Sequence, residues 1–215
     1  MNLKDNLNVK PTAYGIFNIK TFDKDDNVID DFTDNNLIVY SARAVMAGQI
    51  GSYVSSTEIA PINQFFLGTR GHRGDNILDT VLVGEEQTDM GLFDPERSSM
   101  FSQESGEYNY GIEFDPNGGK VVTREALAGT LYSGLVEDST DEPTNTISRE
   151  ITGARENEIK YTITIETPNG NVPGQATPYT EAALYAGDNL FAMKTFPARV
   201  KENTVKFVIT WSIIF

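Results

Sequence analysis

Hydrophobic and polar residues alternate almost without interruption from Val205 to Phe215. The apolar set consists of Val205, Phe207, Ile209, Trp211, Ile213 and Phe215, and the polar residues between them include Lys206, Thr210 and Ser212. A two-residue period rich in β-branched and aromatic side chains is typical of a strand that buries one face. We therefore expect residues 190–215 to form two strands joined by a short turn, with Trp211 and Phe215 in the core.

Similar patterns predict further strands along the chain. Two hairpins are expected, one around an acidic turn after residue 22 and one around Gly187-Asp188-Asn189, because turn residues separate two apolar runs at each place. The remaining strands follow from alternation or from short apolar runs. The expected strand segments are 14–22, 28–32, 62–69, 158–166, 181–186 and 190–196.

The region 86–150 carries weaker periodicity and several turn sequences. Within it, 108–114 and 120–124 are suited to pair as a hairpin across a glycine-containing turn. Just before this region, 79–85 fits a short strand or a turn equally well. We expect the rest of 86–150 to be an irregular, loop-rich insertion, and residues 1–12 to be a polar arm.

One helix is predicted, from Leu37 to Gly48. Two sets of residues recur every four positions, as expected for a helical face: Leu37, Ser41 and Val45, and Ile38, Ala42 and Met46. The asparagines before Leu37 can cap its amino end, and Gly48 or Gly51 can end it. Its many small residues predict close packing on a sheet.

The composition agrees with a strand-rich fold. Hydrophobic residues make up 39% and charged residues 22% of 215 residues, and 18 glycines and nine prolines are spread along the chain. We therefore expect a mainly β protein with β-sandwich-like antiparallel sheets, one short α-helix in the amino-terminal third, and long loops. The whole chain, 1–215, is expected to form a single domain.

Charge and cysteine content exclude several classes of function. The formal net charge of −14 argues against sequence-specific binding to nucleic acid, because phosphate neutralisation requires lysine and arginine. The absence of cysteine excludes disulfides, thiolate metal sites and cysteine nucleophiles. No stretch approaches the roughly 18 apolar residues of a membrane span, and no apolar signal segment is visible, so no membrane partner is expected.

The acidic turn invites a comparison with calcium loops. Asp23, Asp25 and Asn27 match the first three ligand positions of an EF-hand loop. Val28 stands where the loop needs glycine, however, and Asp34 stands where it needs a bidentate glutamate. We favour a solvated turn, and we expect no bound metal or cofactor.

The segment after the strand at 62–69 is glycine-rich and carries the only histidine. It fits three interpretations: a phosphate-binding loop, an Arg73-Gly74-Asp75 adhesion tripeptide, or a surface turn whose arginines meet the acidic remainder of the chain or a neighbouring subunit. No helix pattern opens after the glycines to support phosphate binding. We favour the surface turn, and its candidate interface residues are Arg70, His72, Arg73 and Asp75.

Nothing in the sequence indicates catalysis. Nucleophilic triads usually need a histidine beside the nucleophile, and the one histidine lies in a glycine-rich loop without a Gly-x-Ser-x-Gly elbow. Among the 31 acidic residues no pair stands out as a glycosidase dyad. We therefore expect that the protein is not an enzyme and has no catalytic residues.

Several segments, taken in order, resemble a family of tailed-bacteriophage virion proteins that comprises tail, collar and fibre-attachment components. The resembling segments are Asn36-Leu37-Ile38-Val39, Phe65-Phe66-Leu67-Gly68-Thr69, Asp79-Thr80-Val81-Leu82, Thr180-Glu181-Ala182-Ala183-Leu184-Tyr185, Leu190-Phe191-Ala192-Met193-Lys194-Thr195-Phe196 and Phe207-Val208-Ile209-Thr210-Trp211-Ser212-Ile213. Members of that family carry glycine where Ala183 stands, and the region 86–150 has no counterpart in them.

The resemblance implies a non-enzymatic structural subunit of the virion, assembled in the bacterial host cytoplasm as a symmetric oligomer. Its place would be the neck or collar and the adjoining tail, with the baseplate or fibre attachment as a further option. Its partners would be other virion proteins and copies of itself. The alternative is a receptor- or carbohydrate-binding module in which Tyr108, Tyr110 and Tyr132 stack on sugars.

Overall fold

The computed structural model describes most of the chain outside the amino-terminal arm and the long central region. The described residues are 13–38, 40–51, 61–69, 71–73, 76–80, 108–114, 122–127, 145–152, 157–167, 169–171, 175–187 and 189–215. The arm 1–12, and the parts of 86–150 outside these ranges, therefore lie outside the described residues.

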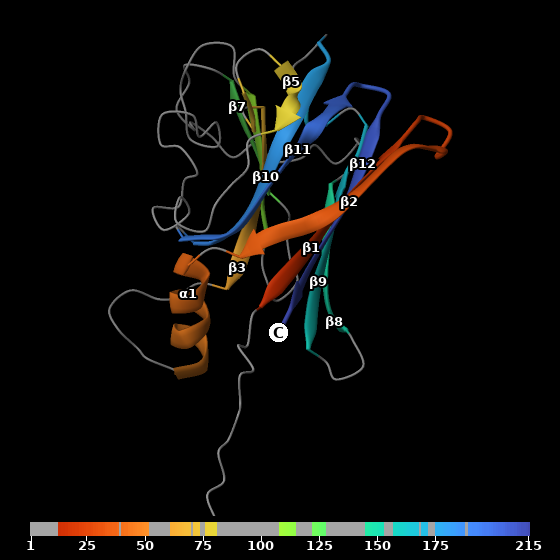
Figure 1. Ribbon diagram of the computed structural model, residues 1–215. Coiled ribbons are helices and arrows are strands. Elements are labelled where there is room, and N and C mark those ends of the chain that lie inside the picture. The colour runs from red at the N-terminus through yellow and green to blue at the C-terminus, as the bar shows by residue number, and fades with distance from the viewer. Residues whose placement is uncertain are drawn as a thin grey trace, which may run out of the picture.

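Antiparallel strands make up nearly all of this structure (Figure 1). The strands are β1 (Tyr14–Phe22), β2 (Val28–Ile38), β3 (Ile62–Gly68), β4 (His72–Arg73), β5 (Asn76–Thr80), β6 (Tyr108–Glu113), β7 (Val122–Leu127), β8 (Thr146–Thr152), β9 (Glu158–Ile165), β10 (Thr177–Ala186), β11 (Asn189–Lys201) and β12 (Lys206–Ile214). Ten form one hydrogen-bonded array in the order β7-β6-β3-β10-β11-β2-β1-β12-β9-β8, and β4 and β5 form a separate ribbon. The predicted mainly β fold class is confirmed.

The ten-stranded array is divided into two facing half-sheets. The first half-sheet contains β2, β1, β12, β9 and β8, and the second contains β7, β6, β3, β10 and β11. Within the described residues, their backbones pair with each other only where the end of β2 meets β11, at Ile38 opposite Ala192 and Leu37 opposite Met193. Figure 1 shows β2 running from one group of strands to the other.

The core lies between the half-sheets, and β12 is its centre. The inward side chains of β12 are fully buried, namely Phe207, Ile209, Trp211 and Ile213. Trp211 packs edge-on against Phe17 of β1 at 5.0 Å and against Phe65 of β3 at 6.4 Å between ring centroids. Since Phe65 belongs to the second half-sheet, Trp211 connects the two layers through aromatic contact.

The predicted burial of Phe215 is wrong. β12 ends at Ile214, and the Phe215 side chain is 51% exposed. Its backbone N–H donates to the Asn157 carbonyl oxygen, and the Asn157 amide donates to the Phe215 carbonyl oxygen. The backbone N–H and C=O of Phe215 are therefore hydrogen-bonded, although its side chain lies outside the core.

The helix exists, but it begins later than predicted. α1 spans Tyr40–Gly51, and Leu37 and Ile38 belong to β2. The asparagines proposed as helix caps lie in β2 as well, because pairing with β1 and β11 extends that strand to Ile38. Ala42 and Val45 are buried as predicted, and α1 packs against β11.

The central region contributes more strands than predicted. The hairpin of β6 and β7 is confirmed, although β7 covers 122–127 rather than 120–124. β8 was not predicted, and it pairs with β9 along its whole length. The ambiguous segment 79–85 is described only at its start, where β5 ends at Thr80.

The outer face of the second half-sheet is partly covered. β5 packs against β10 and β11, and α1 packs against β11. Every residue of β10 except Pro178 is buried as a result. The helix in the described part of the chain is too short to cross a membrane.

Candidate functional site

The predicted interface segment is anchored more firmly than a surface turn. The N–H of Gly71 donates to the Thr180 hydroxyl oxygen at 2.8 Å, in a buried position on β10. A Cβ at residue 71 would overlap the Thr180 carbonyl oxygen, so the close approach requires glycine. Gly71 therefore fixes the start of the β4–β5 ribbon on β10.

The four candidate interface residues are only partly described. His72 is half-buried in β4 opposite Thr80, and its buried Nδ1 has no hydrogen-bond partner among the described residues. The structure describes Arg73 by its backbone alone, and Arg70 and Asp75 lie outside the described residues. Gly71 thus holds the backbone of His72 and Arg73 in place, while the clustering of all four side chains stays a prediction.

The acidic turn between β1 and β2 uses its first carboxylate internally. Asp23 Oδ1 accepts the N–H groups of Asp25 and Asn27 at 2.8 and 2.9 Å, and the Asn27 amide also donates to it. The backbone hydrogen bond from Asn27 is the main cause that lowers the pKa of Asp23. Such contacts are typical of a self-contained turn. No group of three or more potential metal ligands occurs among the described residues.

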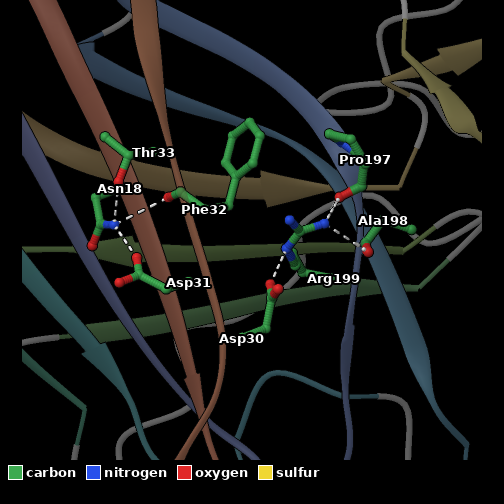
Figure 2. Close-up of polar contacts among 8 residues, drawn as sticks. All are labelled: Asn18, Asp30, Asp31, Phe32, Thr33, Pro197, Ala198 and Arg199. Carbon is green, nitrogen blue, oxygen red and sulfur yellow. Dashed lines mark hydrogen bonds and ion pairs between the residues drawn. The ribbon is translucent and has the colours of Figure 1, made fainter.

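Side chains from β11 bridge the gap to β2 where backbone pairing stops. Lys194 donates to Asp34 at 2.6 Å, and Arg199 forms an ion pair with Asp30 (Figure 2). Lys194 and Arg199 are only 15% and 16% exposed at their side chains. We call these four residues the bridged margin. The Lys194 hydrogen bond is the main cause that lowers the pKa of Asp34.

Arg199 has several partners within the bridged margin. Its Nη1 donates to the carbonyl oxygens of Pro197 at 2.7 Å and Ala198 at 3.3 Å, and its guanidinium lies 5.0 Å from the centre of the Phe32 ring. Figure 2 shows the guanidinium between the Asp30 carboxylate and these two carbonyls. The arginine therefore supplies donors to carbonyls of β11 and holds β2 by charge and by contact with an aromatic face.

The neighbouring hairpin of β1 and β2 is held by Asn18. Its Nδ2 lies 2.6 Å from Asp31 Oδ1, 2.7 Å from Thr33 Oγ1 and 3.1 Å from the Phe32 carbonyl oxygen. The Asn18 hydrogen bond, followed by that of Lys20, lowers the pKa of Asp31. The aspartates in this part of β2 thus have partners on β1 and on β11.

A buried polar network connects the half-sheets elsewhere. Asn145, just before β8, donates to the Tyr110 hydroxyl oxygen of β6 and accepts the Glu166 N–H at 3.0 Å. Tyr179 of β10 donates to the Gly170 carbonyl oxygen at 2.7 Å. Tyr110 is fully buried, so its predicted role in stacking on sugars is wrong. The Tyr108 side chain and Tyr132 lie outside what the structure describes.

Lys201, at the end of β11, is a buried lysine that no sequence pattern indicated. Burial lowers its pKa to about 8, and the charge of Glu166 opposes that shift. The adjoining turn lines an open hollow of about 330 Å³, formed by Gln175, Ala176, Glu202, Asn203 and Thr204. This lining offers one carboxylate beside amide and hydroxyl groups.

The contacts that sequence reasoning missed are long-range ones. Asp30 and Arg199, and Tyr110 and Asn145, are far apart in the chain, and no local spacing connects them. Asn18 and Lys201 occupy ordinary positions in strands, so their local sequence carries no signal of a polar contact. A positive charge at three places on one strand, β11, is the only local hint of the bridged margin.

No family model, curated protein or solved structure matches this chain.

Proposed function

We propose that the protein is a structural subunit of a tailed-phage virion, located in the neck or collar and the adjoining tail. It assembles as a symmetric oligomer with copies of itself and with other virion proteins. Its joints are the 1–12 arm, the 68–76 segment and the 86–150 region. The proposal includes no catalytic step.

One observation carries the proposal: the segments that resemble the phage family become neighbours in space. Five of the six segments fall in β3, β10, β11, the end of β2, and β12, and all but β12 are consecutive in the order of the array. The sixth, at 79–82, is described only at Asp79 and Thr80, which end β5 in the separate ribbon. The strand β1 alone separates the end of β2 from β12. Scattered chance similarities would not be expected to assemble into one contiguous framework.

The anchoring of Gly71 supports a role for the 68–76 segment. A joint between subunits works best on a fixed support, because ordering a loose segment costs conformational entropy. The hydrogen bond from Gly71 to Thr180 and the packing of β5 on β11 hold the ribbon before any partner arrives. His72 and Arg73 then meet a neighbour from a preorganised position.

The direct test is the protein content of purified particles of the encoding phage. Quantitative mass spectrometry should find the chain in the virion, at a fixed ratio to the capsid and tail proteins that matches a symmetric ring. Its absence from particles that contain all other structural proteins would overturn the proposal. Saturable binding of the isolated chain to a defined glycan would instead support the receptor-binding alternative.

Removal of the arm tests how the subunit is incorporated. A chain that begins at Ala13 keeps all of β1, so we expect it to fold and to be missing from particles. The matched control replaces residues 1–12 by a glycine-serine linker of equal length, which separates a need for length from a need for sequence. Normal incorporation of the shortened chain would exclude the arm as a joint.

A further inference from the structure

β8 ends the array of strands on one side. It pairs with β9 from Thr146 opposite Thr164 to Thr152 opposite Glu158, without a register shift. No described strand lies on its other side. In an antiparallel strand paired on one side only, alternate residues direct their N–H and C=O groups outward. β8 therefore presents a row of backbone donors and acceptors at the edge of the first half-sheet, which we call the β8 margin.

The β8 margin lacks two features that commonly prevent edge pairing. It contains no proline, and its pairing with β9 shows no bulge. Arg149 is the charged residue on the inward row, and it hydrogen bonds with Tyr161, the residue directly opposite on β9. The rest of the Arg149 side chain is exposed, so a positive charge stands on this face of β8.

Apolar side chains flank Arg149 symmetrically. Ile147 and Ile151 lie on the same side of β8, two residues before and two residues after Arg149. Ile147 is partly buried against the core, whereas Ile151 is 65% exposed. An exposed isoleucine beside unpaired backbone is the arrangement expected where another strand docks.

We propose that the β8 margin binds the β8 margin of a second copy, in antiparallel register about a two-fold axis at Arg149. This inference deepens the proposed function and rests on it, because it assigns one joint between copies. The geometry favours a second copy because the strand is self-complementary in this register. Ile147 faces Ile151 of the other copy, and all seven residues of the strand overlap.

The remaining pairs agree with this register except at the axis. Ser148 faces Glu150 of the other copy, and Thr146 faces Thr152. Both are favourable or neutral cross-strand pairs. Arg149 faces itself, and like charges directly opposite weaken strand pairing. The dimer is therefore concentration-dependent, and the charge at the axis limits its affinity.

Sedimentation velocity over a wide concentration range tests the proposal with the full-length chain. The wild type should show a reversible monomer–dimer equilibrium, and Ile151→Lys should weaken it at least tenfold. The matched control is Ile29→Lys on β2, since Ile29 is 58% exposed and lies on the other side of the first half-sheet from β8. The control should leave the dissociation constant unchanged. A wild type that is monomeric throughout, or equal effects of both variants, would overturn the proposal.

A single-cysteine experiment tests the register and does not depend on affinity. Since the chain has no cysteine, Arg149→Cys introduces the only thiol, and two such residues on the axis fall within disulfide distance. Mild oxidation should link Arg149→Cys into a covalent dimer much faster than Ile29→Cys. Equal rates would overturn the two-fold register. This outcome is also expected if the copies associate head to tail, because the two cysteines would then not face each other.

Removing the charge of Arg149 at the two-fold axis should strengthen the dimer rather than weaken it. Arg149→Thr should tighten the dimer about fivefold by removing the like-charge pair. Circular dichroism of each variant confirms that the fold is intact before its association is compared. If the protein is found in virions but these solution tests fail, the β8 joint is wrong while the proposed function stands.

Discussion

The first half-sheet ends differently at its two sides. At the β2 side, Lys194 and Arg199 of β11 form ion pairs with aspartates of β2. The ring of Phe196, also on β11, lies 6.2 Å from the ring of Phe32 between centroids. At the β8 side, no described element continues the sheet, and Ile151 is exposed. Among the described residues, the β2 edge is thus closed by β11, whereas the β8 edge has no neighbouring strand.

The two sides also differ in the strength of their ion pairs. The cations of the bridged margin are 15% and 16% exposed, against 35% for Lys160 beside β8, whereas the acidic partners are similarly exposed on both sides. Exposed pairs typically contribute about 0–1 kcal/mol, while removing one partner of a desolvated pair costs more. This difference indicates that the ion pairs on the β2 side contribute more to stability than the pair beside β8.

The largest loss of stability is expected from a substitution that removes the aromatic packing beneath the bridged margin. Phe196 is fully buried and stacks on Phe17 at 5.3 Å, so Phe196→Ala should lower the free energy of unfolding by about 3–5 kcal/mol. Ile151→Ala, the control at the other edge, should change it by less than about 0.5 kcal/mol. Chemical denaturation measures both, and equal losses would refute the contrast.

The next effect concerns Lys201, at the end of the strand that supplies the bridging cations. Burial lowers the pKa of Lys201 from 10.5 to about 8, so the unfolded state binds more protons between these values. Stability should therefore rise with pH between about 8 and 10, by an amount approaching about 3 kcal/mol for the full shift. Lys201→Met should flatten this rise in denaturation curves, whereas Lys160→Met should leave it unchanged.

A smaller effect separates the two kinds of ion pair. Arg199→Met keeps most of the side-chain length but removes the pair with Asp30 and two hydrogen bonds to carbonyls, so it should cost about 2 kcal/mol. Lys160→Met should cost less than about 1 kcal/mol in the same assay. Indistinguishable losses would show that burial of the cation does not govern these pairs.

The smallest effect is the acid sensitivity of the Lys194–Asp34 pair. The folded pKa of Asp34 is lowered below its ordinary value of 3.8, so its stabilising contribution is present above that value and is lost as pH falls further. Because Asp34 is 52% exposed, the loss should stay below about 1 kcal/mol. Asp34→Asn should reduce the slope of stability against pH below 4, measured by thermal unfolding.

Local pattern predicted the strands that bury one face and failed where two patterns competed. β1 has the predicted bounds, and β12 matches within one residue, because alternation and burial coincide there. Leu37 and Ile38 fit a helical repeat, but pairing with β11 places them in β2. β8 was missed because Arg149 stands in the apolar phase of its alternation, where its contact with Tyr161 accommodates it.

The candidate site was less predictable than the fold. The Gly71 contact with Thr180 spans more than a hundred residues, and its glycine looked like part of a flexible loop. The ion pairs of the bridged margin likewise depend on how β11 crosses β2, which no local spacing encodes. Polar contacts of this kind follow from topology, so sequence alone identifies the residue types without their partners.

β2 belongs to both layers, since residues 28–36 pair with β1 and residues 37 and 38 pair with β11. Neither layer can melt without disturbing a backbone segment of the other. Heating should accordingly produce a single calorimetric peak whose measured enthalpy equals the van't Hoff value. Mechanical load applied to one layer would pass to its counterpart through one continuous peptide ribbon.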